Sequence, residues 1–340
     1  MEYIEKSHSE FEDPSLEDFL ITIRLLTPQI KPILSEVYRS GRGRPPYDPL
    51  AMLSSILYRT RTHSLRQLCR ELRSNPELLR LVGLSKTPTH QAFSVFLNRI
   101  GEERLRRISE LTVGELRKHW PDFGQVMSID GTVVKAYAKR NHGFLSVTDP
   151  DARLGYKEHR SGKPTFEFGY RFTIATEAKY EVPITGVTTP ANTNENRVFP
   201  IILKQAKNLG LPLDVVTADA QYDSRRNLWL TIGYGAKPVI ALNPRSSKSA
   251  KQTGSRRGDA ILPIRRNSTE WKRYLAMRSA SERVNSALKD HVGLKTLKAR
   301  GLSRVTTFFW ICVLTKQLFA LSAARLGRDD LSRSILVWCY

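Results

Sequence analysis

The chain has 340 residues, of which 54 are Lys or Arg and 33 are Asp or Glu, so its formal net charge is +21. This length is enough to bury a sizeable core and is typical of two domains, or of one domain with a large appendage. The charge is high for an ordinary soluble enzyme and favours a partner that carries phosphates, although a merely solubilising charge has the same composition.

The positive charge is unevenly distributed along the chain. Residues 1–40 hold four basic and eight acidic side chains, which leaves +25 for the other 300 residues. The three cysteines have no zinc-type spacing, which fits a reducing cytosol; they are Cys69, Cys312 and Cys339. The N-terminus lacks the order of a signal peptide, and the most apolar stretch, residues 305–324, is interrupted by Lys316 and Gln317. We therefore expect a cytoplasmic protein with a buried C-terminal helix and no membrane partner.

The first 120 residues are predicted to be helical. Residues 1–40 form an acidic leader with one helix from about Ser15 to Leu26. A Gly- and Pro-rich linker follows, and apolar residues then recur at helical spacing over residues 50–116, in stripes separated by short polar breaks. Three short helices suit a helix-turn-helix-like DNA-binding domain over residues 41–120, and a plain helical bundle would have the same pattern.

From residue 121 the pattern changes to strands that are followed by alternating helices and strands. The predicted strands are residues 124–138, 166–178, 182–190, 213–220 and 237–242, and the predicted helices are residues 194–210, 223–233 and 269–291. This order predicts an α/β domain, a mixed five-stranded sheet flanked by helices, over residues 121–325. A basic loop at residues 243–270 is inserted in this domain, and residues 326–340 form a C-terminal tail.

Three acidic residues are placed where a metal site would need them. Asp130 lies within an apolar run of the first strand, and Asp219 ends the fourth strand, where open α/β sheets place their ligand sites. Glu282 lies in the final long helix. First and fourth strands are commonly neighbours in such a sheet, so the two aspartates could converge. Converging carboxylates repel one another unless a cation lies between them, and hard oxygen ligands suit Mg²⁺ or Mn²⁺.

Each carboxylate also has a structural alternative. An aspartate at a strand end is often a cap or a turn former, and Asp223 competes with Asp219 for the functional role. A lone glutamate on a helix, such as Glu282, is usually solvated. Asp130 is the hardest to explain without a function, because its sequence neighbours are apolar.

The helix that carries the glutamate has one polar face. At about 100° per residue, Tyr274, Arg278, Glu282 and Lys289 fall within about 40° of one another, and Asn285 shares their face. Basic groups on both sides of an acid can bind phosphates that flank the reacting one. The alternative is an Arg–Glu pair that only supports a surface helix.

A basic segment lies between the fifth strand and the glutamate helix. Residues 244–273 contain nine Lys or Arg residues, among them Arg256, Arg257, Arg265 and Arg266. We predict a loop that becomes ordered on DNA, and a solvated insert without a binding role is the alternative.

Several short motifs occur together in the order of one protein family. They are SIDGT around Asp130, FGYR at residues 168–171, TPAN at residues 189–192, ADAQYDS around Asp219, and Arg278, Glu282 and Lys289 at fixed spacing. In this combination the chain resembles, over residues 40–320, the bacterial insertion-sequence transposases, which are DDE enzymes with a ribonuclease-H-like core. The glutamate segment resembles their Tyr-Arg-Glu-Lys signature, from which Tyr274 departs by one residue.

The resemblance implies a fold, a site and an activity. It implies a ribonuclease-H-like fold, a metal-binding triad of Asp130, Asp219 and Glu282, and DNA contacts by Arg278 and Lys289. The expected activity is metal-dependent cleavage at transposon ends and strand transfer into target DNA, with two Mg²⁺ or Mn²⁺ ions per site. The expected partners are double-stranded DNA and a second copy of the chain, in the bacterial cytoplasm at the nucleoid. A domesticated, catalytically silent DNA-binding relative and a stand-alone nuclease are the alternatives.

Overall fold

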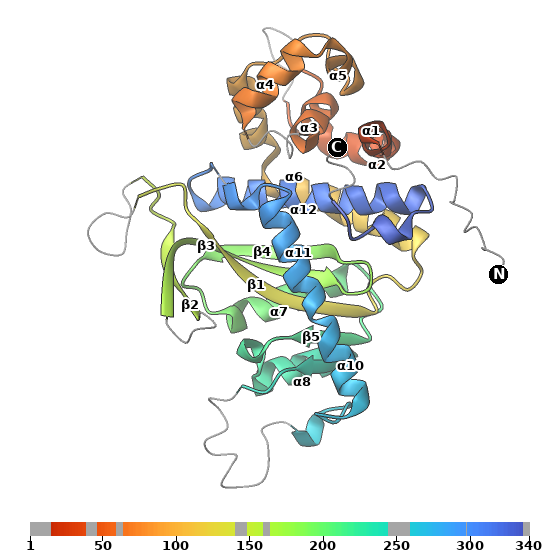
Figure 1. Cartoon of the computed structure of the whole chain (residues 1–340), viewed down its shortest axis with the longest axis vertical. Helices are drawn as coiled ribbons and strands as arrows, with labels where there is room; N and C mark the ends of the chain where they lie inside the picture. The colour runs from red at the N-terminus through yellow and green to blue at the C-terminus, as the bar shows by residue number, and fades with distance from the viewer. Residues whose placement is uncertain are drawn as a thin grey trace, which may run out of the picture.

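The computed structural model describes residues 15–38, 46–58, 64–139, 148–158, 164–243, 259–296 and 298–335. Figure 1 shows a sheet covered by helices, with several of the N-terminal helices gathered at one end of the molecule. Arg256 and Arg257 lie outside the described residues, so their predicted DNA contacts stay predictions.

The N-terminal part is helical, as the sequence predicts. The helices described there are α1 (Leu16–Leu25), α2 (Thr27–Ser35), α3 (Pro49–Tyr58), α4 (Leu65–Ser74), α5 (Pro76–Leu81) and α6 (His90–His119). The two polar breaks between the predicted helical stripes, residues 74–76 and 87–89, each begin a helix. The side chain of Asn75 accepts from the Leu78 backbone N–H, and that of Thr89 accepts from the Ala92 backbone N–H. Helix α2 was not predicted, and its first turn contains Pro28, a position that tolerates proline.

Helix α1 packs against the last long helix, α12 (Leu302–Arg325). The rings of Phe19 and Phe319 lie 4.6 Å apart, and Ser322 Oγ donates to Thr22 Oγ1 over 2.8 Å. By length and composition α12 could cross a membrane, but 89% of its apolar window is buried inside the protein. It is therefore placed as a core helix, with α6 beside it (Figure 1).

The centre of the fold is a mixed sheet. Its strands are β1 (Val126–Lys135), β2 (Arg153–Glu158), β3 (Pro164–Glu177), β4 (Val182–Pro190), β5 (Val215–Ala218) and β6 (Lys237–Ile240). The order is β2-β3-β1-β5-β6, and β4 also pairs with β3. The pairs that involve β3 are antiparallel, whereas β1–β5 and β5–β6 are parallel. The mixed sheet flanked by helices that the strand order predicts is confirmed.

The predicted strand count of five was wrong, because β2 makes a sixth strand. Its sequence, RLGYKE, has a glycine in the middle and too little alternation to indicate a strand. The strand forms through pairing with β3 and needs its glycine, since a Cβ at Gly155 would lie 2.7 Å from the Ala191 Cβ. This element therefore depends on contacts between distant parts of the chain.

The two faces of the sheet carry different helices. Ser128 of β1 donates to Ser281 of α11 (Ser279–Asp290), so the face of the even-numbered β1 residues is covered by α11. Gly131 of β1 lies against Glu195 at the start of α7 (Glu195–Asn208), which covers the opposite face beside α8 (Arg225–Gly233). Figure 1 shows α11 crossing in front of β1.

The predicted helix over residues 269–291 is divided in two. Helix α10 (Thr269–Met277) ends where α11 begins, at Arg278. The carbonyl of Arg278 accepts from the hydroxyls of Ser281 and Ser128 over 2.8 and 3.2 Å, and the backbone N–H of Arg278 donates to the Leu275 carbonyl in a tighter, three-residue turn. The division thus coincides with the contact between this helix and β1.

Candidate active site

The two predicted aspartates are neighbours across parallel strands. Strands β1 and β5 pair in a register that ends with Ile129 opposite Ala218, so that Asp130 and Asp219 are the next residues of each. Parallel strands lie about 4.8 Å apart, which keeps the backbones of the two residues close. Sheet register alone therefore brings together two carboxylates separated by almost ninety positions in the sequence.

The two carboxylates disfavour each other's ionisation. Burial raises the pKa of Asp130 to about 6, and the negative charge of Asp219 adds to this rise. The backbone N–H of Gly131, the charge of Arg278 and the amide of Asn285 act in the opposite direction. Burial also raises the pKa of Asp219, an effect that backbone hydrogen bonds and Arg278 partly offset. Such a pair gains from any cation placed between its members.

Asn285 has a different partner from the one predicted. It was predicted to contact DNA, but it is 6% exposed and its Nδ2 donates to Asp130 Oδ2 over 2.9 Å. The hydrogen bond between Ser128 and Ser281, 2.9 Å long, fixes α11 against β1 one turn earlier. Asn285 therefore orients the Asp130 carboxylate, and local sequence patterns could not predict this contact because it joins residues that are far apart in the chain.

Glu282 lies on the same helix but is turned towards Arg278. Its side chain is 53% exposed, and Glu282 Oε1 lies 2.7 Å from Arg278 Nη1. Among the residues that the structure describes, no three His, Cys, Asp or Glu side chains are grouped closely enough to hold a metal ion. The structure thus assembles the two aspartates, and Glu282 is paired with a cationic side chain whose charge also acts on both of them.

The other predicted DNA contacts are placed differently from one another. Arg265 is exposed, whereas the Arg266 side chain is 3% exposed and lies 3.0 Å from Asp223 Oδ1. Tyr274 is partly buried and packs against a small apolar cluster that includes Trp271. Lys289 lies in the last turn of α11 and is also partly buried.

Asp223 was the alternative to Asp219 and has structural partners here. Its carboxylate also accepts from the Asn243 backbone N–H over 3.0 Å, and its own side chain is 1% exposed. Ser224, rather than Asp223, caps α8, by accepting from the Asn227 backbone N–H. Of the two aspartates after β5, Asp219 is the one that lies beside Asp130.

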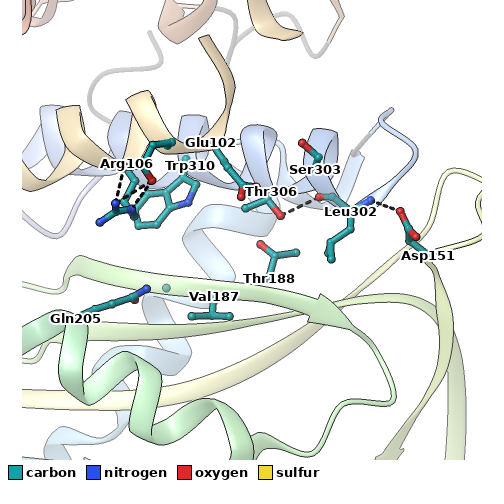
Figure 2. A pocket seen from close by; sticks show the side chains of 12 residues that line it. Glu102, Arg106, Asp151, Val187, Thr188, Gln205, Leu302, Ser303, Thr306 and Trp310 are labelled. Atoms are coloured by element: carbon teal, nitrogen blue, oxygen red, sulfur yellow. Dashed lines mark hydrogen bonds and ion pairs between the residues drawn. The ribbon is translucent and has the colours of Figure 1, made fainter. Parts of the chain in front are cut away.

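A separate cleft of about 550 Å³ lies between α6 and α12 on one side and β4 and α7 on the other. Figure 2 shows Arg106, Trp310, Thr188 and Gln205 around it, and Asp151 accepting from the Leu302 backbone N–H. None of the predicted site residues that the structure describes lines this cleft. The carboxylate pair is therefore not the floor of this cleft.

Two residues near the aspartates were not predicted as site residues. Arg171 is the last residue of the FGYR motif, and its charge interacts with those of Asp130 and Asp219. Glu195, 6% exposed, forms an ion pair with Arg171. The sequence could have indicated this ion pair only through an arginine in a partly apolar strand and an acidic residue at the start of the next helix.

The sheet is mixed and places two aspartates side by side on neighbouring parallel strands, and the helix that carries Glu282 crosses it. These features are those of an α/β protein with a carboxylate site. Residues 121–315 match the family model described as Transposase DDE domain, and residues 9–99 match the one described as Transposase domain (DUF772). Because the first match covers more than half of the chain, the chain belongs to the DDE transposase family. The resemblance seen in the short motifs is confirmed.

Solved structures of transposases show weaker similarity. A piggyBac transposase synaptic complex with hairpin DNA is 10% identical with a TM-score of 0.47, over 93% of this chain and 79% of that chain. A Mos1 transposase paired-end complex with the left transposon end is 14% identical with a TM-score of 0.23, over 79% and 87%. No curated protein matches the sequence. The family assignment therefore rests on the family models.

Proposed function

We propose that this chain is a DNA transposase in which Asp130, Asp219 and Glu282 hold two Mg²⁺ or Mn²⁺ ions, and that it cleaves at transposon ends and transfers strands into target DNA. The observation that carries the proposal is the position of Asp130 and Asp219 at adjacent places in parallel strands, where burial raises the pKa of both. Enzymes of the DDE family use divalent metal ions, and two buried carboxylates side by side fit such an ion.

The ions, when bound, supply an activated attacking oxygen and stabilise the leaving oxygen of the phosphodiester. The chain's own residues prepare the site for them. Asn285 keeps the Asp130 carboxylate turned towards α11 through its 2.9 Å hydrogen bond. Arg278, 2.7 Å from Glu282, is suited to exchange this partner for a DNA phosphate, which would free Glu282 for the site.

The partners follow from charge and from the reaction. A net charge of +21 attracts a polyanion such as double-stranded DNA. Joining two transposon ends needs two active sites, so we propose a homodimer on DNA. We also propose that the protein works in the bacterial cytoplasm, at the nucleoid.

The proposal is tested on duplexes that carry the genomic DNA flanking both ends of the reading frame. Wild-type protein should cut these duplexes in Mg²⁺ or Mn²⁺. Asp130→Asn and Asp219→Asn should bind them with unchanged affinity and cut at least about 100-fold more slowly. Asp214→Asn, which changes an exposed aspartate just before β5, is the matched control and should cut normally. Normal cleavage by Asp130→Asn would refute the assignment.

A second candidate is a DNA-binding relative that has lost catalysis. The pairing of Glu282 with Arg278, and the lack of a three-ligand cluster within the described residues, favour this candidate. It predicts the same DNA affinity with and without metal and no cleavage at any metal concentration. A stand-alone nuclease would instead cut duplexes without transposon ends and would never join strands.

A further inference from the structure

The start of α7 carries a buried ion pair that the reaction described above does not use. Glu195 and Arg171 of β3 form this pair, with side chains that are 6% and 12% exposed. Arg171 also donates through Nε and Nη2 to the Ala191 carbonyl, over 3.4 Å each. A buried pair of this kind is seldom the cheapest way to stabilise a fold, because both charges must be removed from water. Its location therefore matters more than its strength.

The Glu195 carboxylate supports the backbone directly behind Asp130. A Cβ added to Gly131 would lie 2.9 Å from the Glu195 carboxyl carbon, so only a glycine leaves room for this contact. Successive residues of a strand face opposite sides of the sheet, and Asp130 faces α11 while Gly131 faces α7. The carboxylate of Glu195 thus presses against β1 from the side opposite to the catalytic one.

The next residue of α7 holds the segment that follows Asp219. Asn196 Nδ2 donates to the Gln221 carbonyl over 2.7 Å, and Asn227 Nδ2 donates to Asn196 Oδ1 over 2.8 Å. Gln221 in turn donates its backbone N–H to Asp219 Oδ1 over 2.9 Å. Two consecutive residues, Glu195 and Asn196, therefore connect to the backbone of one aspartate and to the turn that orients the other.

We infer that Arg171, Glu195 and Asn196 are positioning residues that set the spacing of the Asp130 and Asp219 carboxylates before metal binds. The inference rests on the proposed function, since it concerns the same metal site. Two buried carboxylates repel each other, and the end of β5 is free to turn away unless another element holds it. The N-terminus of α7 contacts the surroundings of both aspartates at once and resists that movement. The Arg171 charge acts on both aspartates from the opposite face of the sheet.

The inference is tested by metal affinity, measured separately from cleavage. The free Mn²⁺ signal in electron paramagnetic resonance gives the affinity of the full chain bound to end-containing DNA. We expect Glu195→Gln and Asn196→Ala to weaken Mn²⁺ binding by about 10-fold or more, because partners outside the ligand shell typically contribute 10–100-fold. Affinity for the DNA, measured without metal, should stay within about twofold, since neither residue belongs to the predicted DNA face.

Gln205→Ala is the matched control. Gln205 lies on the same helix and accepts from Thr185 Oγ1 over 2.9 Å, away from the aspartates. This variant should lower the melting temperature and leave Mn²⁺ affinity unchanged. If Glu195→Gln does not fold, Asn196→Ala decides the question, because Asn196 is only partly buried.

The outcomes separate this inference from the proposed function. Wild-type affinity for Mn²⁺ in both variants would overturn the inference and leave the proposed function standing. A loss of affinity in Gln205→Ala as large as in Asn196→Ala would also overturn it, because the effect would then be general destabilisation. Wild-type protein that binds no Mn²⁺ on DNA would overturn the proposed function and this inference together.

Discussion

The two aspartates lie where two neighbouring parallel strands stop pairing, whereas the glutamate of the candidate site lies on an exposed helical surface. Asp130 and Asp219 directly follow Ile129 and Ala218, the last paired residues of two parallel strands, so sheet pairing keeps their backbones close. The side chain of Glu282 is 53% exposed and forms an ion pair with Arg278, four residues earlier. The sheet thus holds two of the proposed ligands close together, whereas the proposed third, Glu282, is engaged in a side-chain ion pair that can be exchanged.

This difference shows how the protein can hold two carboxylates close together when no metal ion is bound between them. Repulsion within the buried pair is offset by Arg278 and by the Asn285 amide, both on the glutamate helix segment. Arg278 therefore acts on all three carboxylates. Binding of a DNA phosphate to Arg278 would remove a counter-charge from the aspartates and release Glu282 in the same event, which favours metal binding on DNA over metal binding in its absence.

The largest expected difference between the two regions is in metal affinity without DNA. Asp219→Asn should weaken Mn²⁺ binding by the DNA-free protein more than about 100-fold, since it removes a ligand and even partners outside the ligand shell contribute 10–100-fold. Glu282→Gln should change this affinity less than about threefold, because Glu282 is held by Arg278 when DNA is absent. Calorimetric titration measures both. Equal losses in the two variants would mean that all three carboxylates are already assembled.

The second largest expected effect is on the free energy of unfolding, which should rise in a pH-dependent way when the charge of Asp130 is removed. Burial raises the pKa of Asp130 from the ordinary value of 3.8 to about 6, so ionised Asp130 destabilises the metal-free protein. The contribution that protonated Asp130 makes to stability is complete below about pH 4 and is lost as the pH rises to about 6. Asp130→Asn should therefore be more stable than wild type above pH 6, by about 2–3 kcal/mol, and equal to it near pH 4. Urea unfolding between pH 4 and 8 measures the difference.

Added Mn²⁺ provides the control for that experiment. At pH 7.5 it should stabilise the wild type and have little effect on Asp130→Asn, since binding to the folded state alone raises stability. A variant that is no more stable than wild type at pH 8 would show that burial and the charge of Asp219 do not raise the pKa of Asp130.

A smaller effect should come from the amide that turns Asp130 towards α11. Asn285→Ala removes the 2.9 Å hydrogen bond to the ionised form, so the pKa of Asp130 should rise above 6, by about one unit. The fall in stability should then occur at higher pH than in wild type. Ser286→Ala, which changes an exposed neighbour on the same helix, should leave the transition where it is. An unchanged transition in Asn285→Ala would contradict the orienting role.

The aspartate pair could be predicted because its geometry follows from the order of strands. Asp130 stands out within an apolar run, and the first strand and the strand before Asp219 are neighbours in the mixed sheet that the sequence predicts. Parallel pairing then fixes their register. The glutamate helix was also predicted, although its division at Arg278 depends on hydroxyl groups from another strand.

Contacts between distant side chains could not be predicted in this way. Arg265 and Arg266 are adjacent and identical, yet one is exposed and the other is buried against Asp223. Asn285 shares a helical face with the predicted DNA contacts, but its own side chain donates to Asp130. In each case a partner far away in the sequence decides the role, and the local pattern contains no information about that partner.

The smallest expected effect is on the stability of the exposed pair. Exposed Arg–Glu pairs four residues apart on a helix contribute about 0.3–0.5 kcal/mol, so Glu282→Gln should change the free energy of unfolding by no more than that. Its effect on cleavage of end-containing DNA should nevertheless approach that of Asp130→Asn, because the carboxylate is needed once DNA has taken Arg278. Urea unfolding and cleavage assays on the same preparation measure the two effects, with Glu270→Gln on the exposed surface of α10 as the control. A variant that unfolds and cleaves like wild type would remove Glu282 from the site, whereas a variant destabilised by several kcal/mol would show that its carboxylate is already held inside the fold.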